Sequence, residues 1–251
     1  MLTAVIIAKN EAASLPECLA SLKFCDRILV IDNQSADATA KVALALHARV
    51  LKFAVSGDFA MERNFALDQV KSGWVLFVDA DETVPADLAQ EIVNAIKNPR
   101  IHGYFLPRID FMWGRQLKYG DTGTVNLLRL GQAGQGRWSG RVHETWQISG
   151  PAGRLSHPLI HRPHPTLEKF LQKINFYSSV RAGELYDAKK TASIWQVIVY
   201  PPAKFVFLWL VKLGFLDGMP GLIHAMTMAF YTFLVRGKLY LLNRGIPSTA
   251  S

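Results

Sequence analysis

The sequence predicts an α/β fold with a mostly parallel sheet, followed by a helical, apolar C-terminal region. In the first 100 residues, apolar runs rich in β-branched residues alternate with helical patterns, at intervals that suit right-handed crossovers between parallel strands. Half of the 251 residues are hydrophobic, so the chain can bury a sizeable core and extensive disorder is not expected. Two long apolar segments close the chain.

The charge changes along the chain. Residues 1–100 carry 10 Lys and Arg against 13 Asp and Glu, whereas residues 101–251 carry 18 against 7, so the net charge moves from −3 to +11. The later half is therefore expected to meet an anionic partner. Apolar and aromatic stretches accompany this charge, and no RNA- or DNA-binding motif does. An anionic membrane surface thus fits better than nucleic acid.

The elements of the first half follow in order from apolar runs and capping residues. Ser14 is the expected N-cap of the first helix, with Pro16 and Glu17 in its first turn. No glycine-rich phosphate loop follows the first strand, which argues against a dinucleotide-binding Rossmann domain and a P-loop enzyme. We expect strands at 2–8, 27–32, 48–53 and 74–78, and helices at 14–22, 38–46, 59–71 and from about 85.

The strand at 74–78 delivers Asp79 and Asp81 at its carboxyl end, which is where open α/β sheets bind ligands. A turn after Val78 would let both carboxylates approach one divalent cation that holds a diphosphate. The alternative is that both are solvated turn residues, with Asp81 or Thr83 capping the next helix.

Four segments, in this order and spacing, resemble the family 2 glycosyltransferases: I-I-A-K-N-E (6–11), I-D-N-Q-S-A-D (31–37), M-E-R-N-F-A (61–66) and V-D-A-D-E (78–82). The later R-V-H-E (141–144) and G-F-L-D-G-M-P-G (214–221) resemble the bacterial branch that adds a sugar to the lipopolysaccharide inner core, the β-1,4-glucosyltransferase-like enzymes. The resemblance implies a GT-A fold, a UDP-sugar donor and a divalent metal, Mg²⁺ or Mn²⁺.

The resemblance also implies a role for residues at the strand ends. Glu11 would meet the ribose, Asp32 the uracil edge, and Arg63 the base or the diphosphate. Ordinary turn roles for the aspartates, and a surface pairing of Arg63 with Glu62 or Asp58, are the alternatives. The set expected to bind the nucleotide sugar is Ala8, Asn10, Glu11, Asp32, Ser35, Asp37, Arg63, Asp79 and Ala80, and Asp81 is expected to bind the metal.

Strands are also expected at 103–108 and 125–130, before the second functional segment. Glu144 is the expected catalytic base, because an inverting transfer needs one group to take the proton from the acceptor hydroxyl. The alternative is a structural Glu144 that bonds a backbone amide or an arginine such as Arg141. His143 is expected to support or pack. Because the resemblance implies a late histidine on the metal, His161 is the expected ligand, and an ordinary loop histidine is the alternative.

The C-terminal region is expected to begin with a helix at 166–188, capped by Thr166. Of the apolar segments at 194–216 and 219–235, the first is broken by Pro201-Pro202 and the second is short for a transmembrane helix. Aromatic residues with interspersed lysines favour helices that lie in a membrane interface. A buried helical core, or a homo-oligomer interface, is the alternative.

We expect the chain to divide into three regions. Residues 1–100 form the nucleotide-sugar-binding α/β half, residues 101–165 form the acceptor-binding and catalytic half of the same domain, and residues 166–251 form the helical region. Cys18 and Cys25 lack metal-type spacing, so reduced thiols are expected. No export signal precedes the first strand. We expect a peripheral enzyme at the inner face of the cytoplasmic membrane.

The expected reaction is metal-dependent and inverting, and moves a sugar, expected to be glucose, from a UDP-sugar to a lipid-anchored saccharide of the lipopolysaccharide inner core. One rival is transfer to a polyprenyl phosphate, whose ionised phosphate needs no base. Another is a nucleotide-sugar- or membrane-binding module without turnover.

Overall fold

The computed structural model describes residues 1–55, 58–123, 125–140, 144–163 and 166–247. Its internal contacts divide the chain into two compact units. Unit 1 comprises Met1–Ile109 and Thr124–Arg162, and unit 2 comprises Asp110–Gly123 and Pro163–Ser251. The division expected at residues 100 and 165 stays a prediction.

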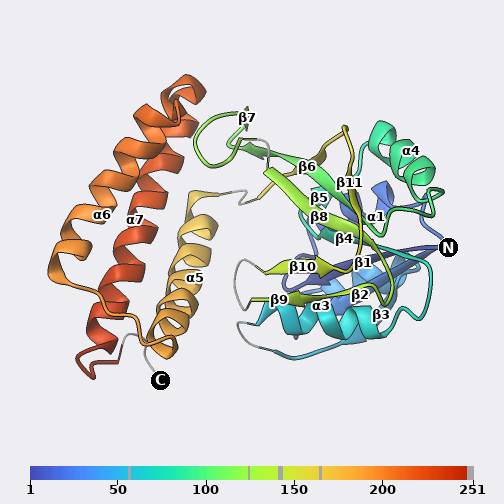
Figure 1. The fold of residues 1–251 in the computed structure, drawn as a ribbon, viewed down its shortest axis with the longest axis horizontal. Coiled ribbons are helices and arrows are strands. Elements are labelled where there is room, and N and C mark those ends of the chain that lie inside the picture. The colour runs from blue at the N-terminus through green and yellow to red at the C-terminus, as the bar shows by residue number, and fades with distance from the viewer. Residues whose placement is uncertain (56–57, 124, 141–143, 164–165, 248–251) are drawn as a thin grey trace. The chain divides into compact units, whose positions relative to one another are not determined.

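Unit 1 is built on a mixed sheet in the order β3-β2-β1-β4-β8-β6-β12-β5 (Figure 1). The first four strands are parallel, and β8 and β6 add antiparallel pairs, which confirms the expected α/β fold. Its strands are β1 (Leu2–Ala8), β2 (Arg27–Asp32), β3 (Arg49–Lys52), β4 (Trp74–Asp79), β5 (Glu82–Thr83), β6 (Gly103–Met112), β8 (Val125–Gln132), β9 (Gly136–Ser139), β10 (Thr145–Ile148), β11 (Ala152–Arg154) and β12 (Leu159–His161).

The register aligns the carboxyl ends of the parallel strands. Ala8 of β1 pairs with Asp32 of β2, and Ile7 pairs with Asp79 of β4 on the other side. Because parallel strands end at the same edge, the segments that carry the expected site residues meet there.

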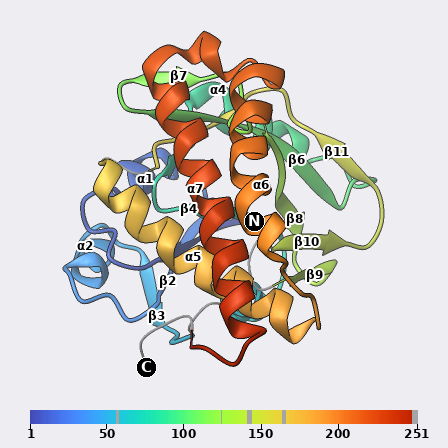
Figure 2. The same ribbon diagram turned by 90° about the vertical axis from the view of Figure 1, so that its left-hand side faces the viewer.

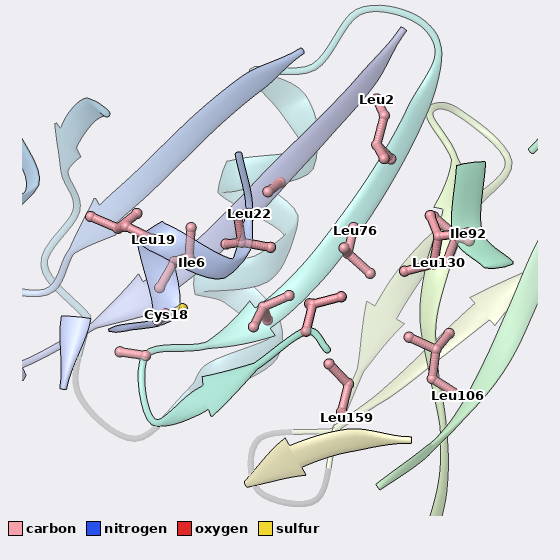
Figure 3. Packing of buried hydrophobic residues seen from close by; sticks show 14 of the residues in the cluster. Leu2, Ile6, Cys18, Leu19, Leu22, Leu76, Ile92, Leu106, Leu130 and Leu159 are labelled. Carbon is pink, nitrogen blue, oxygen red and sulfur yellow. The ribbon is translucent and has the colours of Figure 1, made fainter. Parts of the chain in front are cut away.

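Side chains alternate between the two faces of the sheet, and each face has its own core. Leu2 and Ile6 of β1 belong to one cluster with Leu19 of α1 and Ile92 of α4 (Figure 3). Val5 belongs to the cluster on the opposite face, with Phe77 and residues of α3. Trp138 and Trp146, from the two-stranded sheet of β9 and β10, complete this second cluster. The helices of unit 1 are α1 (Leu15–Ser21), α2 (Thr39–Ala45), α3 (Phe59–Asp68) and α4 (Ala86–Ala95).

The expected caps have different outcomes. Thr166 accepts from the Lys169 amide at 3.2 Å and caps α5 as expected. Ser14 occupies the N-cap position of α1 as expected, but its side chain makes no capping bond, because its hydroxyl donates to Glu11 Oε2 at 2.5 Å. Pro85 precedes α4 without a side-chain cap, which excludes capping by Asp81 or Thr83.

Unit 2 contains three long helices that lie side by side in the order α5, α7, α6 (Figures 1 and 2). By length and composition, Ile194–Val211 and Gly214–Leu242 could each cross a membrane. The last helix ends at Leu242 rather than near 235, so its apolar segment is longer than expected. The elements of unit 2 are β7 (Arg115–Leu117), α5 (Leu167–Asp187), α6 (Ile194–Val206), the π-helical turn η1 (Phe207–Val211), the 3-10 turn η2 (Gly214–Asp217) and α7 (Gly218–Leu242).

We expect Leu76→Ala to lower the free energy of unfolding by about 2–5 kcal/mol, because Leu76 is fully buried in the central strand and its loss leaves a cavity. Leu44→Ala is the matched control, since Leu44 is 60% exposed, and its effect should stay within about 0.5 kcal/mol. Urea denaturation measures both. Equal losses in the two variants would contradict the assignment of the core.

Candidate active site

The loops that follow β1 and β2 are hydrogen-bonded to each other. The Asn10 amide donates to the Ser35 hydroxyl at 3.0 Å, and the Ala36 amide donates to the Asn10 side chain at 2.8 Å. The Ala12 amide donates to Asp37 at 3.1 Å. Asn10 has a left-handed backbone (φ +57°), a conformation that asparagine tolerates better than most residues. Side chains expected to bind the donor therefore also fix the shape of this edge.

Thr39 joins the same loops. Its hydroxyl accepts from the Glu11 amide at 2.9 Å and bonds the Asp37 carboxylate. The Thr39 hydroxyl bond is the main reason that the pKa of Asp37 is lowered. Glu11 and Asp37 thus lie at the expected edge, and their nucleotide contacts stay predictions.

Asp32 is buried at the end of β2 and accepts from the Ser35 amide at 3.2 Å. The next residue, Asn33, is also buried; its side chain donates to the Val55 carbonyl at 2.9 Å and to Glu62 of α3. Sequence reasoning missed Asn33 and Glu62 as members of this cluster. The sequence did give one indication: Asn33 and Glu62 lie inside the segments 31–37 and 61–66, which resemble the family.

Arg63 of α3 is buried and holds two carboxylates at once. Its Nη2 lies 2.8 Å from Asp79 Oδ1, and its Nε lies 2.8 Å from Glu144 Oε1. The guanidinium carbon lies 4.8 Å from the centre of the Trp138 ring, a cation–π contact. The alternative of a solvated surface pair with Glu62 or Asp58 is wrong. Asp58 instead caps α3.

Asp79 is held by a second arginine that sequence reasoning missed. Arg129 of β8 places Nη2 2.7 Å from Asp79 Oδ2 and Nη1 3.3 Å from Oδ1. Burial alone would raise the pKa of Asp79, but the charges of Arg129 and Arg63 outweigh it and hold the pKa well below its usual range. The signal for Arg129 was one charge inside an apolar strand pattern, Leu127 to Leu130.

A tight turn follows β4, as expected, and separates the two aspartates. The Asp79 amide donates to Glu82 Oε2 at 2.9 Å, across the turn. Glu82 is fully buried, and burial, followed by the Asp79 charge, raises its pKa. Arg63 and Arg129 bond Asp79, and His161 lies 3.5 Å from Asp81 and also acts on the Asp79 charge.

The antiparallel pairing of β12 with β5 brings His161 to Asp81. His161 lies opposite Glu82 in the register, and its Nε2 is 3.5 Å from Asp81 Oδ1. A carboxylate oxygen and an imidazole nitrogen this close can share a divalent cation, whose other ligands would be diphosphate oxygens and water. No cluster of three or more His, Cys, Asp or Glu with metal-site geometry occurs in the described part of the chain. Asp81 and His161 thus offer two donors of a kind that divalent cations accept, and their role as metal ligands stays a prediction.

Glu144 lies next to residues 141–143, which are outside the described part of the chain, so nothing is assigned to Arg141 or His143. Glu144 bonds the guanidinium of Arg63, a pairing with an arginine of the kind that was the alternative to a catalytic role. Ala8 and Ala80 are buried at the same edge of the sheet. The expected residues of both halves thus gather in unit 1, and their individual roles stay predictions.

The sequence model described as "Glycosyl transferase family 2" matches residues 3–146, more than half of the chain. The chain belongs to this family. It is a glycosyltransferase, and the resemblance drawn from its four short segments is confirmed.

Relatives match over nearly the whole chain. The lipopolysaccharide core biosynthesis glycosyltransferase LpsC of Rhizobium meliloti is 29% identical over 247 residues, which cover 95% of this chain and 92% of LpsC. An uncharacterized glycosyltransferase of Rickettsia typhi is 26% identical over 93% of this chain and 85% of its own length. The crystal structure of S. aureus TarS 1–349 is similar in fold, with a TM-score of 0.51 at 15% identity, covering 97% of this chain and 91% of TarS.

Glu62 gives the site a pH dependence. Burial raises its pKa from 4.5 to about 7, although the Arg63 and Lys9 charges offset part of the effect. Below pH 4.5 Glu62 is protonated in both folded and unfolded chains, whereas above pH 7 the unfolded chain gains more from ionisation. We expect Glu62→Gln to equal the native chain in stability near pH 4.5 and to exceed it by up to about 3 kcal/mol above pH 7.

Urea denaturation at several pH values between these limits measures the difference. Glu168→Gln is the control, because Glu168 is exposed on α5 and its substitution should have no such pH dependence. A Glu62→Gln effect that is constant with pH would show that Glu62 ionises as freely in the fold as in water.

Proposed function

We propose that this glycosyltransferase moves a sugar, expected to be glucose, from a UDP-sugar to a hydroxyl of the lipopolysaccharide inner core, with inversion and with Mg²⁺ or Mn²⁺. The observation that carries the proposal is the gathering of Asp32, the Asp79–Arg63–Glu144 network and the Asp81–His161 pair in one unit. The likeness to LpsC over 95% of the chain supports the acceptor class.

The residues at the strand ends have the chemistry to bind a UDP-sugar donor. Asp32 offers a carboxylate that can accept from the N–H of a uracil ring, and Glu11 can accept from ribose hydroxyls. Arg63 Nη1 is buried and makes no hydrogen bond to any residue that the structure describes. A guanidinium N–H without a protein acceptor suits a diphosphate oxygen. Asp79 fixes this guanidinium in place from the other side.

Asp81 and His161 would hold the divalent cation, which when bound spreads the negative charge that develops on the leaving diphosphate. Asp81 is oriented by its own backbone, because its carbonyl accepts from the Arg162 amide at 2.9 Å and thereby pins the turn to the end of β12. The protein would therefore keep the Asp81 and His161 side chains at a fixed distance from each other.

Glu144 would take the proton from the acceptor hydroxyl as that oxygen attacks the anomeric carbon. Its bond to Arg63 fixes one carboxylate oxygen, Oε1, and leaves Oε2 as the acceptor for the proton. The acceptor is expected to be anchored in lipid at the cytoplasmic face of the inner membrane. The excess of 18 Lys and Arg over 7 Asp and Glu in residues 101–251 suits the phosphate and carboxylate groups of an inner core.

Acceptor-dependent UDP release tests the proposal, with purified protein, a panel of UDP-sugars and deacylated inner-core oligosaccharide. We expect Glu144→Gln to lower the rate by about 10²–10⁴-fold, because the amide cannot accept the proton. Glu168→Gln is the control and should retain full activity. If Glu144→Gln is fully active, the acceptor needs no base, and polyprenyl phosphate becomes the favoured acceptor. If no pair gives UDP release despite UDP binding, the inner-core acceptor is wrong, and transfer to a polyprenyl phosphate is favoured first and a module without turnover second.

Metal removal makes a separate prediction. A chelator should abolish UDP release, and Mg²⁺ or Mn²⁺ should restore it. In Asp81→Ala the metal concentration for half-maximal rate should rise by at least about ten-fold, because one of two protein ligands is lost. Asp87→Ala, on the exposed side of α4, is the control. Full activity in the presence of chelator would show that the reaction needs no divalent metal.

A further inference from the structure

Helix α6 and the turn η1 present an apolar surface that the described residues of unit 2 do not cover. No residue of α6, which is described throughout, is buried, and in Ile194–Val211 only 6% of the side chains are. Water-soluble helices normally bury an apolar face and expose a polar one, whereas this segment exposes an apolar face. Its exposed residues are all uncharged: Ile194, Trp195, Ile198, Val199, Tyr200, Pro202, Ala203, Val206, Phe207, Leu210 and Val211.

Lys204 of α6 and Lys238 of α7 bond partners within unit 2. Lys204, midway along the segment, places Nζ 3.1 Å from Asp121, which also lies 3.3 Å from His224 of α7. Lys238 of α7 donates to Asn175 and Ser178 of α5, each at 2.8 Å. A membrane-spanning arrangement of these helices would carry such groups into hydrocarbon, at high cost. An arrangement parallel to the membrane leaves them on the protein side.

The two prolines also favour an interfacial position. Pro201 and Pro202 have no amide hydrogen, so the carbonyls of Val197 and Ile198 lack their usual helical donor. In the hydrocarbon core such carbonyls would have no partner, whereas water reaches them among lipid headgroups. The apolar surface runs from Ile194 to Val211, about 26 Å at the rise of a helix, and a helix lying flat could bury it over this whole length.

Basic and aromatic residues border the surface. Arg236 lies over the Tyr200 ring at 4.9 Å, and Lys212 lies over the Phe207 ring at 5.7 Å. Such pairs are common where one end of a side chain meets lipid and the other meets headgroups or water. Unit 2 carries 12 Lys and Arg against 6 Asp and Glu, a net charge of +6.

We propose that Ile194–Val211 is a docking helix that lies in the plane of an anionic lipid bilayer, with its uncharged surface among the acyl chains and its basic border against the headgroups. The occupant of this surface is lipid rather than a second copy of the chain, because two units of charge +6 repel each other whereas anionic headgroups attract them. The proposal rests on the proposed function in one respect only: the purpose of docking would be to reach a lipid-anchored acceptor.

The test uses the full chain and vesicles of phosphatidylcholine, with or without phosphatidylglycerol, in a sedimentation assay. Ile198→Asp combined with Leu210→Asp places two charges on the surface and should weaken vesicle binding by at least about ten-fold. The control is Leu44→Asp combined with Leu46→Asp, which changes two similarly exposed leucines of unit 1 and should bind like the native chain. Native binding should be tighter with phosphatidylglycerol and weaker in high salt.

Two further readouts separate the outcomes. Lipids with brominated acyl chains should quench tryptophan fluorescence, and Trp195→Phe, which removes a ring that is 71% exposed, should reduce that quenching. Light scattering without lipid reports the oligomeric state. The proposal is overturned if the double variant binds vesicles like the native chain, or if the native chain ignores vesicles and forms a dimer that the variant separates. Vesicle binding needs no donor, acceptor or metal, so it succeeds or fails independently of the proposed reaction.

Discussion

The buried Arg63 guanidinium is the interaction on which the candidate site depends. It bonds Asp79 at the end of the central strand and Glu144, which lies 81 residues after Arg63 in the chain. Removing one partner of a buried ion pair costs about 3–5 kcal/mol in comparable proteins, and loss of Arg63 would take the same cation from both Asp79 and Glu144. Its neighbours extend the constraint, because Glu62 bonds Asn33 after β2 and Asn64 exchanges two hydrogen bonds with the Trp138 backbone. Three successive residues of α3 thus hold three distant segments together.

This constraint explains how one short helix can serve both ends of a sugar transfer. Asp79 belongs to the edge that is expected to hold the donor, and Glu144 to the segment that is expected to act on the acceptor. A guanidinium bonded to both fixes their separation, and the Trp138 ring beneath it restricts its rotation. Arg129 adds a second hold on Asp79, so that Asp79 keeps its charge and its orientation. In transferases, small errors in such spacing reduce the rate strongly.

The parts of the fold that are local in sequence were predictable, and the parts that depend on distant contacts were not. The β1, β2 and β4 runs are continuous and apolar, so their strands and the edge bearing Asp32 and Asp79 followed from the pattern. Strands of two to four residues such as β5, β9 and β12 carry too little periodicity to be recognised, and β12 is what brings His161 to Asp81. Arg129 could not be paired from sequence, because its partner is 50 residues away. The sequence placed Ser14 correctly at the N-cap of α1, but it could not show that the Ser14 hydroxyl bonds Glu11 rather than a helix amide.

The central claim is that Arg63 acts through Glu144 as one unit, and a double-mutant cycle on the rate of acceptor-dependent UDP release tests it most directly. Arg63→Lys keeps the charge but cannot bond both carboxylates in the same geometry, and Glu144→Gln keeps the shape but removes the base. If the two residues form one unit, the double variant should be no slower than the slower single variant. If the two losses multiply instead, Arg63 and Glu144 act independently, and the account of the site is wrong.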